Sequence, residues 1–247
     1  MHADSAAQQV LLQVQAQDTH MDQLTHRART LPVLESIAAA EARLADLASL
    51  LVAARTEVSD ITREQARADT DVEQVRTRAD RDRQRLDSGQ INNPKELQAL
   101  TQEIESLQRR QSELEDVELE VMERLEAAQR HLAELEAEEA AVQATLASDR
   151  ADRDAQLAAL GQESAAARAE REALVPQLPE DLVALYEKLR GTLGGVGAAE
   201  LHQGRCEGCR LQINATELER LRAAEADEVL RCEECRRILV RTSRSGL

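Results

Sequence analysis

Apolar residues recur at alternating four- and three-residue steps through two long stretches of the chain. From Val33 to Leu86, 14 of 16 positions on this spacing are apolar, and from Leu97 to Leu146 the figure is 12 of 15. A 3.5-residue repeat kept over several heptads is typical of helices that pack along a coiled-coil seam. The polar exceptions are Gln65, Asp82, Gln111, Glu118 and Glu139. The pattern predicts two long helices with a seam made largely of leucine and alanine.

Glycine and proline are absent from both stretches, and the segment between them suits a chain reversal. Gly89 can end the first helix, Asn93 is a favourable N-cap, and Pro94 fits the first helical position. Glu96 is placed to bond back to the cap. These features predict an antiparallel hairpin with its tip at about residues 88–94. A long parallel dimer is the alternative architecture.

The base of the hairpin contains a break on each arm. Pro32 precedes the first stretch, and on the second arm the seam loses its phase between Asp149 and Leu157. A proline kink opposite a heptad discontinuity would bend the rod at this level. Alternatively, Pro32 starts a new helix after a shorter one over residues 5–30. Both interpretations are open at this point.

The composition supports a mostly α-helical fold. The 247 residues include one tyrosine, Tyr186, and no Phe or Trp, while Ala, Glu, Lys, Leu and Arg together number 137. That share exceeds the roughly 50% that indicates a coiled coil or long helix. A large α/β enzyme or a β-sandwich would normally fill its core with aromatic residues. We expect Tyr186 to anchor a short helix, which starts after Pro179, against the base of the rod or the C-terminal part.

Four cysteines carry the one chemical signature of the chain. Cys206 and Cys209 form one C-x-x-C pair, and Cys232 and Cys235 form a second after 22 intervening residues. Two such pairs can present four thiolates to one tetrahedral ion, with backbone NH groups pointing at the sulfurs. The spacing predicts one structural Zn²⁺ in a small zinc ribbon. Because four thiolates fill the shell of the ion, no position remains for substrate and we expect no catalysis there.

These observations predict three segments. Residues 1–175 form a long antiparallel coiled-coil hairpin, residues 176–201 a short helix and a Gly-rich linker, and residues 202–247 a C4 zinc ribbon. A ribbon of this size has little core of its own, so metal binding should be coupled to its folding. In the ribbon, Asn214 and Glu217 have the spacing of a capping box that starts a short helix.

The chain resembles the bacterial C4-type zinc-ribbon proteins with an N-terminal helical hairpin. The resemblance rests on four stretches in order: Leu31-Pro32, residues 93–100, residues 178–190, and the ribbon that ends at residues 232–239. It implies a non-catalytic protein, and some members of the family are described as regulators or chaperones with RNA or sigma-factor partners. One departure is Arg236 after the last cysteine, where the family often has Gly, and the final knuckle is expected to be slightly altered.

Charge separates the two ends of the chain. Residues 1–201 have a net charge of −17 and residues 202–247 of +1, so the rod repels phosphate backbones. Nucleic acid could therefore contact only the ribbon, through its arginines. These are Arg205, Arg210, Arg231, Arg236, Arg237, Arg241 and Arg244. Alternatively, these arginines balance the zinc–thiolate charge.

The expected role is that of a non-enzymatic adaptor or regulator that binds an unidentified protein partner. The alternative is a regulator that binds RNA or DNA through the ribbon. The exposed tip, with Asn92, Asn93 and Lys95, is a second candidate contact. No secretory signal or bilayer-spanning run is present, so we expect a cytoplasmic protein without membrane contact. No small-molecule substrate is expected.

Overall fold

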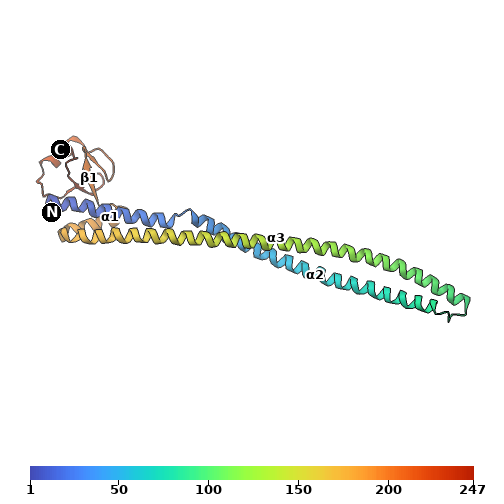
Figure 1. Cartoon of the computed structure of the whole chain (residues 1–247). Coiled ribbons are helices and arrows are strands. Elements are labelled where there is room, and N and C mark those ends of the chain that lie inside the picture. Colours follow the sequence, from blue (N-terminus) through green and yellow to red (C-terminus); the bar gives the residue numbers. More distant parts are fainter. The chain divides into compact units, whose positions relative to one another are not determined.

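The computed structural model describes residues 1–247, which divide into two compact units (Figure 1). One unit consists of Met1–Leu34 and Arg150–Leu247, and the other of Glu35–Asp149. These boundaries do not coincide with the three predicted segments, because the first and last parts of the chain fold together. None of the helices carries the long, nearly uncharged apolar stretch that a membrane-spanning segment needs.

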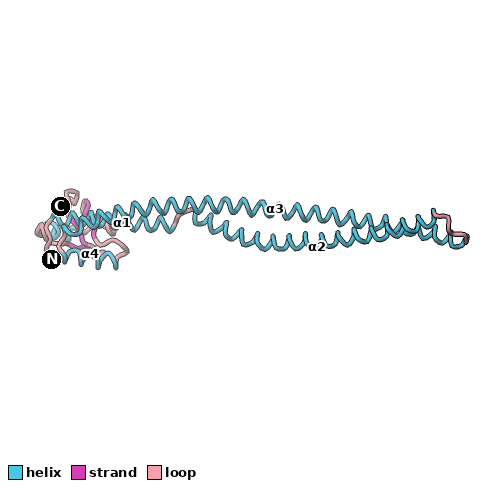
Figure 2. Tube along the Cα trace, turned by 60° about the horizontal axis from the view of Figure 1, so that its bottom comes forward, coloured by secondary structure: helices cyan, strands magenta, loops and turns pink.

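The second unit is an antiparallel helical hairpin, as predicted (Figure 2). Its arms belong to α2 (Val33–Asp87) and α3 (Pro94–Leu174). The buried residues of these arms all lie on the predicted seam: Ile37, Leu47, Leu51, Ala54, Ile61 and Ala79 of α2, and Ile104, Leu107, Val121, Leu125, Ala128, Leu135 and Leu146 of α3. Because the two helices bury the same 3.5-residue row, the heptad pattern alone accounts for their pairing.

The tip follows the predicted turn chemistry with one exception. Gly89 has φ 68°, a left-handed conformation that glycine adopts without strain, and it lies two residues after Asp87, the last residue of α2. The Asn93 side chain accepts a hydrogen bond from the Lys95 backbone N–H at 3.0 Å. Glu96 does not bond back to the cap; its carboxylate accepts from Arg85 at 2.9 Å. An arginine across the turn offers a charged donor, which is a stronger partner than a backbone N–H.

The helix break at Pro32 is the second of the two predicted alternatives. Helix α1 (Ser5–Arg29) ends before Thr30, and α2 starts at Val33. Asp4 caps α1, since its carboxylate accepts from Ala7 N–H at 2.6 Å. In this first unit, Leu160 of α3 packs in a cluster with Leu24 and Leu31. The phase change in the second heptad row thus marks the point beyond which α3 packs against the α1 segment.

The C-terminal part of the chain forms a small mixed sheet with two short helices. A 3-10 turn (Val175–Gln177) leads into α4 (Glu180–Thr192), and α5 (Ala215–Ala223) lies between the cysteine pairs. The strands are β1 (Ala198–His202), β2 (Arg205–Cys206), β3 (Leu230–Arg231) and β4 (Ile238–Val240). The sheet order is β2-β1-β4-β3, with β1 and β4 parallel and the other pairs antiparallel. Strand β1 starts inside the segment predicted as a linker.

The sheet has a separate hydrophobic cluster on each side. One cluster joins Leu11 and Val14 of α1 to Tyr186 of α4 and to Ile238 and Val240 of β4. Backbone bonds also tie the first residues to the sheet, since the Ala3 N–H donates to Asp227 O at 2.7 Å and the Val229 N–H to Met1 O at 3.1 Å. The second cluster contains Leu239 and the cysteines. Its buried members are Ala199, Leu201, Cys206, Ile213, Leu221, Leu230, Cys232 and Leu239.

Candidate metal centre

Two turns of the same backbone pattern carry the cysteine pairs. In the first turn the Arg210 N–H donates to Cys206 O at 2.7 Å, and in the second the Arg236 N–H donates to Cys232 O at 2.9 Å. The first cysteine of each pair also donates its own N–H, Cys206 to Leu211 O at 3.1 Å and Cys232 to Arg237 O at 3.0 Å. Both C-x-x-C pairs therefore form closed knuckles.

Each knuckle ends on an arginine in the left-handed region. The φ angles are 60° for Arg210 and 62° for Arg236. This conformation strains a residue that has a Cβ and favours glycine. The presence of Arg236 therefore costs local strain, but it leaves the hydrogen-bond pattern of the second knuckle the same as that of the first.

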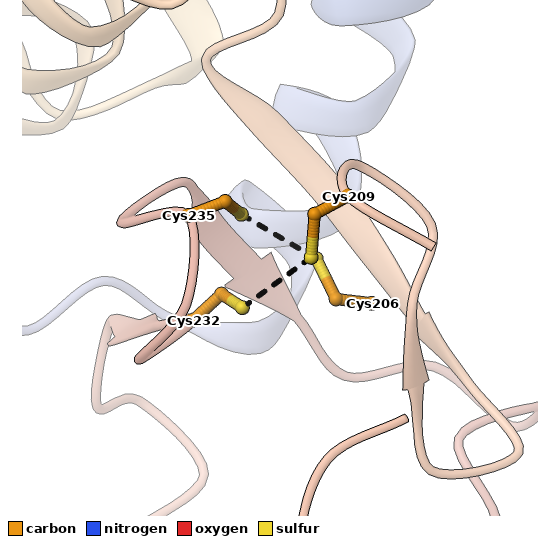
Figure 3. Close-up of side chains that lie close together, drawn as sticks. All are labelled: Cys206, Cys209, Cys232 and Cys235. Carbon is orange, nitrogen blue, oxygen red and sulfur yellow. Dashed lines mark hydrogen bonds between the residues drawn. The ribbon is translucent and has the colours of Figure 1, made fainter. Parts of the chain in front are cut away.

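The four sulfur atoms converge on one point (Figure 3). All four lie within 4.8 Å of one another, with Cys206 Sγ 3.8 Å from Cys235 Sγ and Cys209 Sγ 3.9 Å from Cys232 Sγ. A tetrahedral zinc ion with bonds of about 2.3 Å holds its sulfurs about 3.8 Å apart. The donor set therefore suits one Zn²⁺, and the two closest sulfur pairs already have the tetrahedral spacing.

Burial and hydrogen bonds act in opposite directions on the ionisation of the thiols. Burial raises the pKa of Cys206, although the backbone N–H groups of Cys209 and Gly208 act in the opposite direction. Burial also opposes ionisation of Cys235, but hydrogen bonds, led by those of the Arg237 backbone and side chain, hold its pKa below the ordinary value. Oriented N–H groups favour the thiolate, and a bound divalent ion supplies the remaining charge.

The centre is a structural C4-type zinc site. Its ligands are the four predicted residues, Cys206, Cys209, Cys232 and Cys235. With four protein ligands, the bound ion has no open coordination position. His202 lies outside the cluster; its Nδ1 is 3.8 Å from a Glu207 carboxylate oxygen.

Two of the predicted contact arginines bind backbone carbonyls inside the protein. Arg237 donates from Nε to Val196 O and from a terminal nitrogen to Leu193 O, both at 2.9 Å. Arg241 donates to carbonyls at the end of α5, including Ala224 O at 2.7 Å. Both guanidinium groups therefore hold loops together and have few donors left for a partner.

Three more of these arginines have partners on the surface. Arg205 pairs with Glu207 at 2.7 Å, and Arg244 Nε donates to Glu200 at 3.0 Å. Arg231 donates from Nε to the carbonyl at residue 236 at 2.8 Å. Carboxylates thus neutralise Arg205 and Arg244, and a backbone carbonyl binds the Arg231 guanidinium.

The remaining two, Arg210 and Arg236, project from the ends of the knuckles. Both side chains are exposed and make no hydrogen bond or ion pair within the chain. Leu211, next to Arg210, is 51% exposed although it is a large apolar residue. Of the seven predicted contact arginines, two therefore have side chains without a hydrogen bond or ion pair, and one of these, Arg210, precedes the exposed Leu211 in the sequence.

The predicted contact residues of the hairpin tip are exposed. Asn92, Asn93 and Lys95 all face solvent, and Asn93 is partly used as the cap of α3. They lie in the hairpin unit and are a separate set from the zinc centre. Their role as a contact stays a prediction.

A buried ionic network at the base of the first unit was not predicted. Asp18 is 2% exposed and accepts hydrogen bonds from Tyr186 Oη at 2.6 Å and from Arg171 Nε at 2.8 Å. Arg190 Nε lies 3.5 Å from the same carboxylate. The signal was present in the sequence, since Asp18 is one heptad after Leu11 on the apolar side of the helix. Tyr186 is the anchor that was predicted, with 1% of its surface exposed.

Gln15 is a second buried polar residue whose contacts were not predicted. Its side-chain oxygen accepts from Gly197 N–H at 2.7 Å and from Ala198 N–H at 3.2 Å, and its nitrogen donates to Gly195 O at 3.0 Å. No local pattern identifies a glutamine that bonds to residues about 180 positions away.

Two family models match the chain in the order of its two parts. A CT398-like coiled coil hairpin domain matches residues 14–194, and a C4-type zinc ribbon domain matches residues 205–239. Relatives of similar length are uncharacterized proteins. One from Mycobacterium tuberculosis is 37% identical over 241 residues, with 98% of each chain covered. One from Mycobacterium leprae is 32% identical over 217 residues, which are 88% of this chain and 93% of the relative.

Solved structures show the same architecture. A Mycobacterium smegmatis protein has a TM-score of 0.83 at 34% identity, and the match covers 98% of this chain and 100% of that protein. CT398 from Chlamydia trachomatis has a TM-score of 0.65 at 17% identity, covering 96% of this chain and 98% of its own. The second likeness concerns the fold alone, because its sequence identity is low.

Proposed function

The chain belongs to the family of CT398-like coiled-coil hairpin proteins with a C4-type zinc ribbon, and on that premise we propose that it is a non-enzymatic adaptor working in the cytoplasm. It binds a protein partner through the knuckle end of the ribbon. The four-cysteine centre supports this role, because a filled zinc shell stabilises a surface and has no position for substrate.

One surface feature carries the proposal. Leu211 is 51% exposed beside Arg210, and Arg236 occupies the equivalent place in the other knuckle. Arginine is enriched at protein interfaces, and an exposed apolar side chain such as that of Leu211 loses its contact with water when a partner covers it. The complementary partner is a protein segment with an apolar residue flanked by carboxylates. We call Arg210, Leu211 and Arg236 the knuckle surface.

A charge-reversal experiment tests the role of the knuckle surface. Full-length wild type and an Arg210→Glu/Arg236→Glu variant are crosslinked in cells, and their partners are compared by mass spectrometry. Arg222→Glu is the matched control, since Arg222 is an exposed arginine of α5 without an ion pair. We expect the double variant to lose at least one partner that the control keeps, with one zinc per chain in each protein. Identical partners in all three would disprove the proposed surface.

Nucleic-acid binding is the second candidate, and the two available guanidinium groups are the observation in its favour. If Arg210 and Arg236 supply the phosphate contacts, the slope of log K against log salt is about −1.8 for duplex and about −1.4 for single strands. Titrations of the full chain with labelled RNA and DNA at several salt concentrations measure it. Absence of binding at low salt would exclude this candidate.

A further inference from the structure

The loop between α4 and β1 is held by side chains from two different parts of the first unit. We call residues 193–198 the junction loop. From the ribbon, Arg237 donates to Leu193 O and Val196 O, both at 2.9 Å. From the first helix, Gln15 bonds to Gly195 O at 3.0 Å and to the Gly197 N–H at 2.7 Å. The same few peptide groups therefore receive one side chain from the zinc ribbon and one from α1.

The position of Arg237 depends on both zinc knuckles. It is two residues beyond Cys235, and its carbonyl accepts the Cys232 N–H at 3.0 Å. Its stem lies directly over the first knuckle, because a Cβ added to Gly208 would be 2.6 Å from Arg237 Cδ. Arg237 therefore takes its position only when the two knuckles are held together, which is what a shared ion does.

The other half of the connection is buried. Gln15 is 6% exposed, and the next turn of α1 contains Asp18 with its bond to Tyr186. Adding a Cβ to Gly197 would place it 2.8 Å from the Tyr186 carbonyl, so the junction loop packs directly on α4. A shift of this loop cannot leave α1 and α4 undisturbed, because buried amides without partners are costly.

We propose that the zinc site controls how firmly α1 is held, through Arg237, the junction loop and Gln15. Loss of the ion frees the knuckles, withdraws Arg237 from two carbonyls, and loosens the loop that Gln15 binds. The metal content of the ribbon is thereby transmitted to the helical base. This metal-dependent coupling goes beyond the adaptor role and holds whichever partner the ribbon binds.

Hydrogen exchange of the full-length, zinc-loaded protein tests the coupling. Arg237→Ala removes the link while all four cysteines remain, and metal analysis verifies one zinc per chain. We expect amides of residues 11–20 and 193–198 to exchange about tenfold faster or more, as follows from loss of hydrogen bonds with a charged donor. Peptides of the hairpin unit, such as residues 121–135, should not change. Removal of zinc from wild type should reproduce the effect at residues 11–20.

Two further variants make the result specific. Arg241→Ala is the matched control, since Arg241 also donates to ribbon carbonyls but on the α5 side. It should leave α1 unchanged. Gln15→Ala with zinc bound should speed exchange in the junction loop, and adding Arg237→Ala to it should give less than the product of the two effects. Unchanged protection of α1 in the zinc-loaded Arg237→Ala protein would overturn the proposal. This result would decide even if zinc removal from the wild type unfolds the ribbon and exposes α1.

Discussion

Tyr186→Phe removes a single hydroxyl from the centre of the buried network. The Tyr186 Oη donates to Asp18 at 2.6 Å, and both residues are at most 2% exposed. Burial, followed by the Asp18 carboxylate, raises the pKa of Tyr186, so the phenol stays protonated and remains a donor. A hydrogen bond to a charged group contributes about 1.5–3 kcal/mol. The variant should lose this amount, because Arg171 and Arg190 still compensate the charge but cannot replace the short bond.

Hydrogen exchange measures this loss within the unit concerned, since a chain of two compact units need not unfold in one step. The expected energy corresponds to about 10- to 150-fold faster exchange at residues 182–190. Thr70→Val is the control: it removes a hydroxyl that donates to Ala66 O at 2.7 Å on the exposed side of α2. It should change stability by less than about 0.5 kcal/mol. A change of less than twofold in Tyr186→Phe would show that the bond to Asp18 gives no net stabilisation.

Three smaller predictions follow from single positions. Gly161→Ala should stabilise the chain by about 0.5–1 kcal/mol, because an added Cβ inside α3 meets nothing within 4 Å. Gly197→Ala should destabilise it, because the added Cβ would lie 2.8 Å from a backbone oxygen. The shifts in melting temperature of the two variants should have opposite signs. Burial and the nearby carboxylate of Asp69 raise the pKa of Glu118. The folded state therefore binds this proton more tightly than the unfolded state, and wild-type stability should increase as pH falls through that pKa. Glu118→Gln should raise the melting temperature at pH 7 and should gain less stability than the wild type as pH falls. An identical pH profile of the two proteins would contradict the raised pKa of Glu118. Arg236→Gly should relieve the φ of 62° and stabilise the zinc-bound ribbon by about 1 kcal/mol. Chemical denaturation at fixed free zinc measures this gain, and no gain would contradict the assignment of backbone strain to Arg236.

The hairpin and the zinc ligands could be predicted because each depends on a local pattern. A seam residue such as Leu51 needs only the repeat around it, and a tetrahedral ion needs only two C-x-x-C pairs within reach of each other. The contacts of individual side chains were less predictable. Glu96 had two charged or polar donors within reach and took Arg85, and Arg237 was classed with the surface arginines although it binds two carbonyls. The sequence identifies a side chain that can form hydrogen bonds, but only the fold determines which partners surround it.

The place of α1 at the ribbon could have been inferred from one strand. Ile238, Leu239 and Val240 are consecutive apolar residues, and each is 0% exposed. Side chains alternate across a strand, so a ribbon open to solvent on one side would show a polar residue in such a run. Leu239 packs with the cysteines, whereas Ile238 and Val240 pack with α1 and α4. A continuous apolar strand thus required a second covering layer, which residues 3–14 supply together with α4. The zinc ion and α1 therefore stabilise opposite faces of the same strand, and neither residues 202–247 nor the N-terminal helix contains a complete core alone.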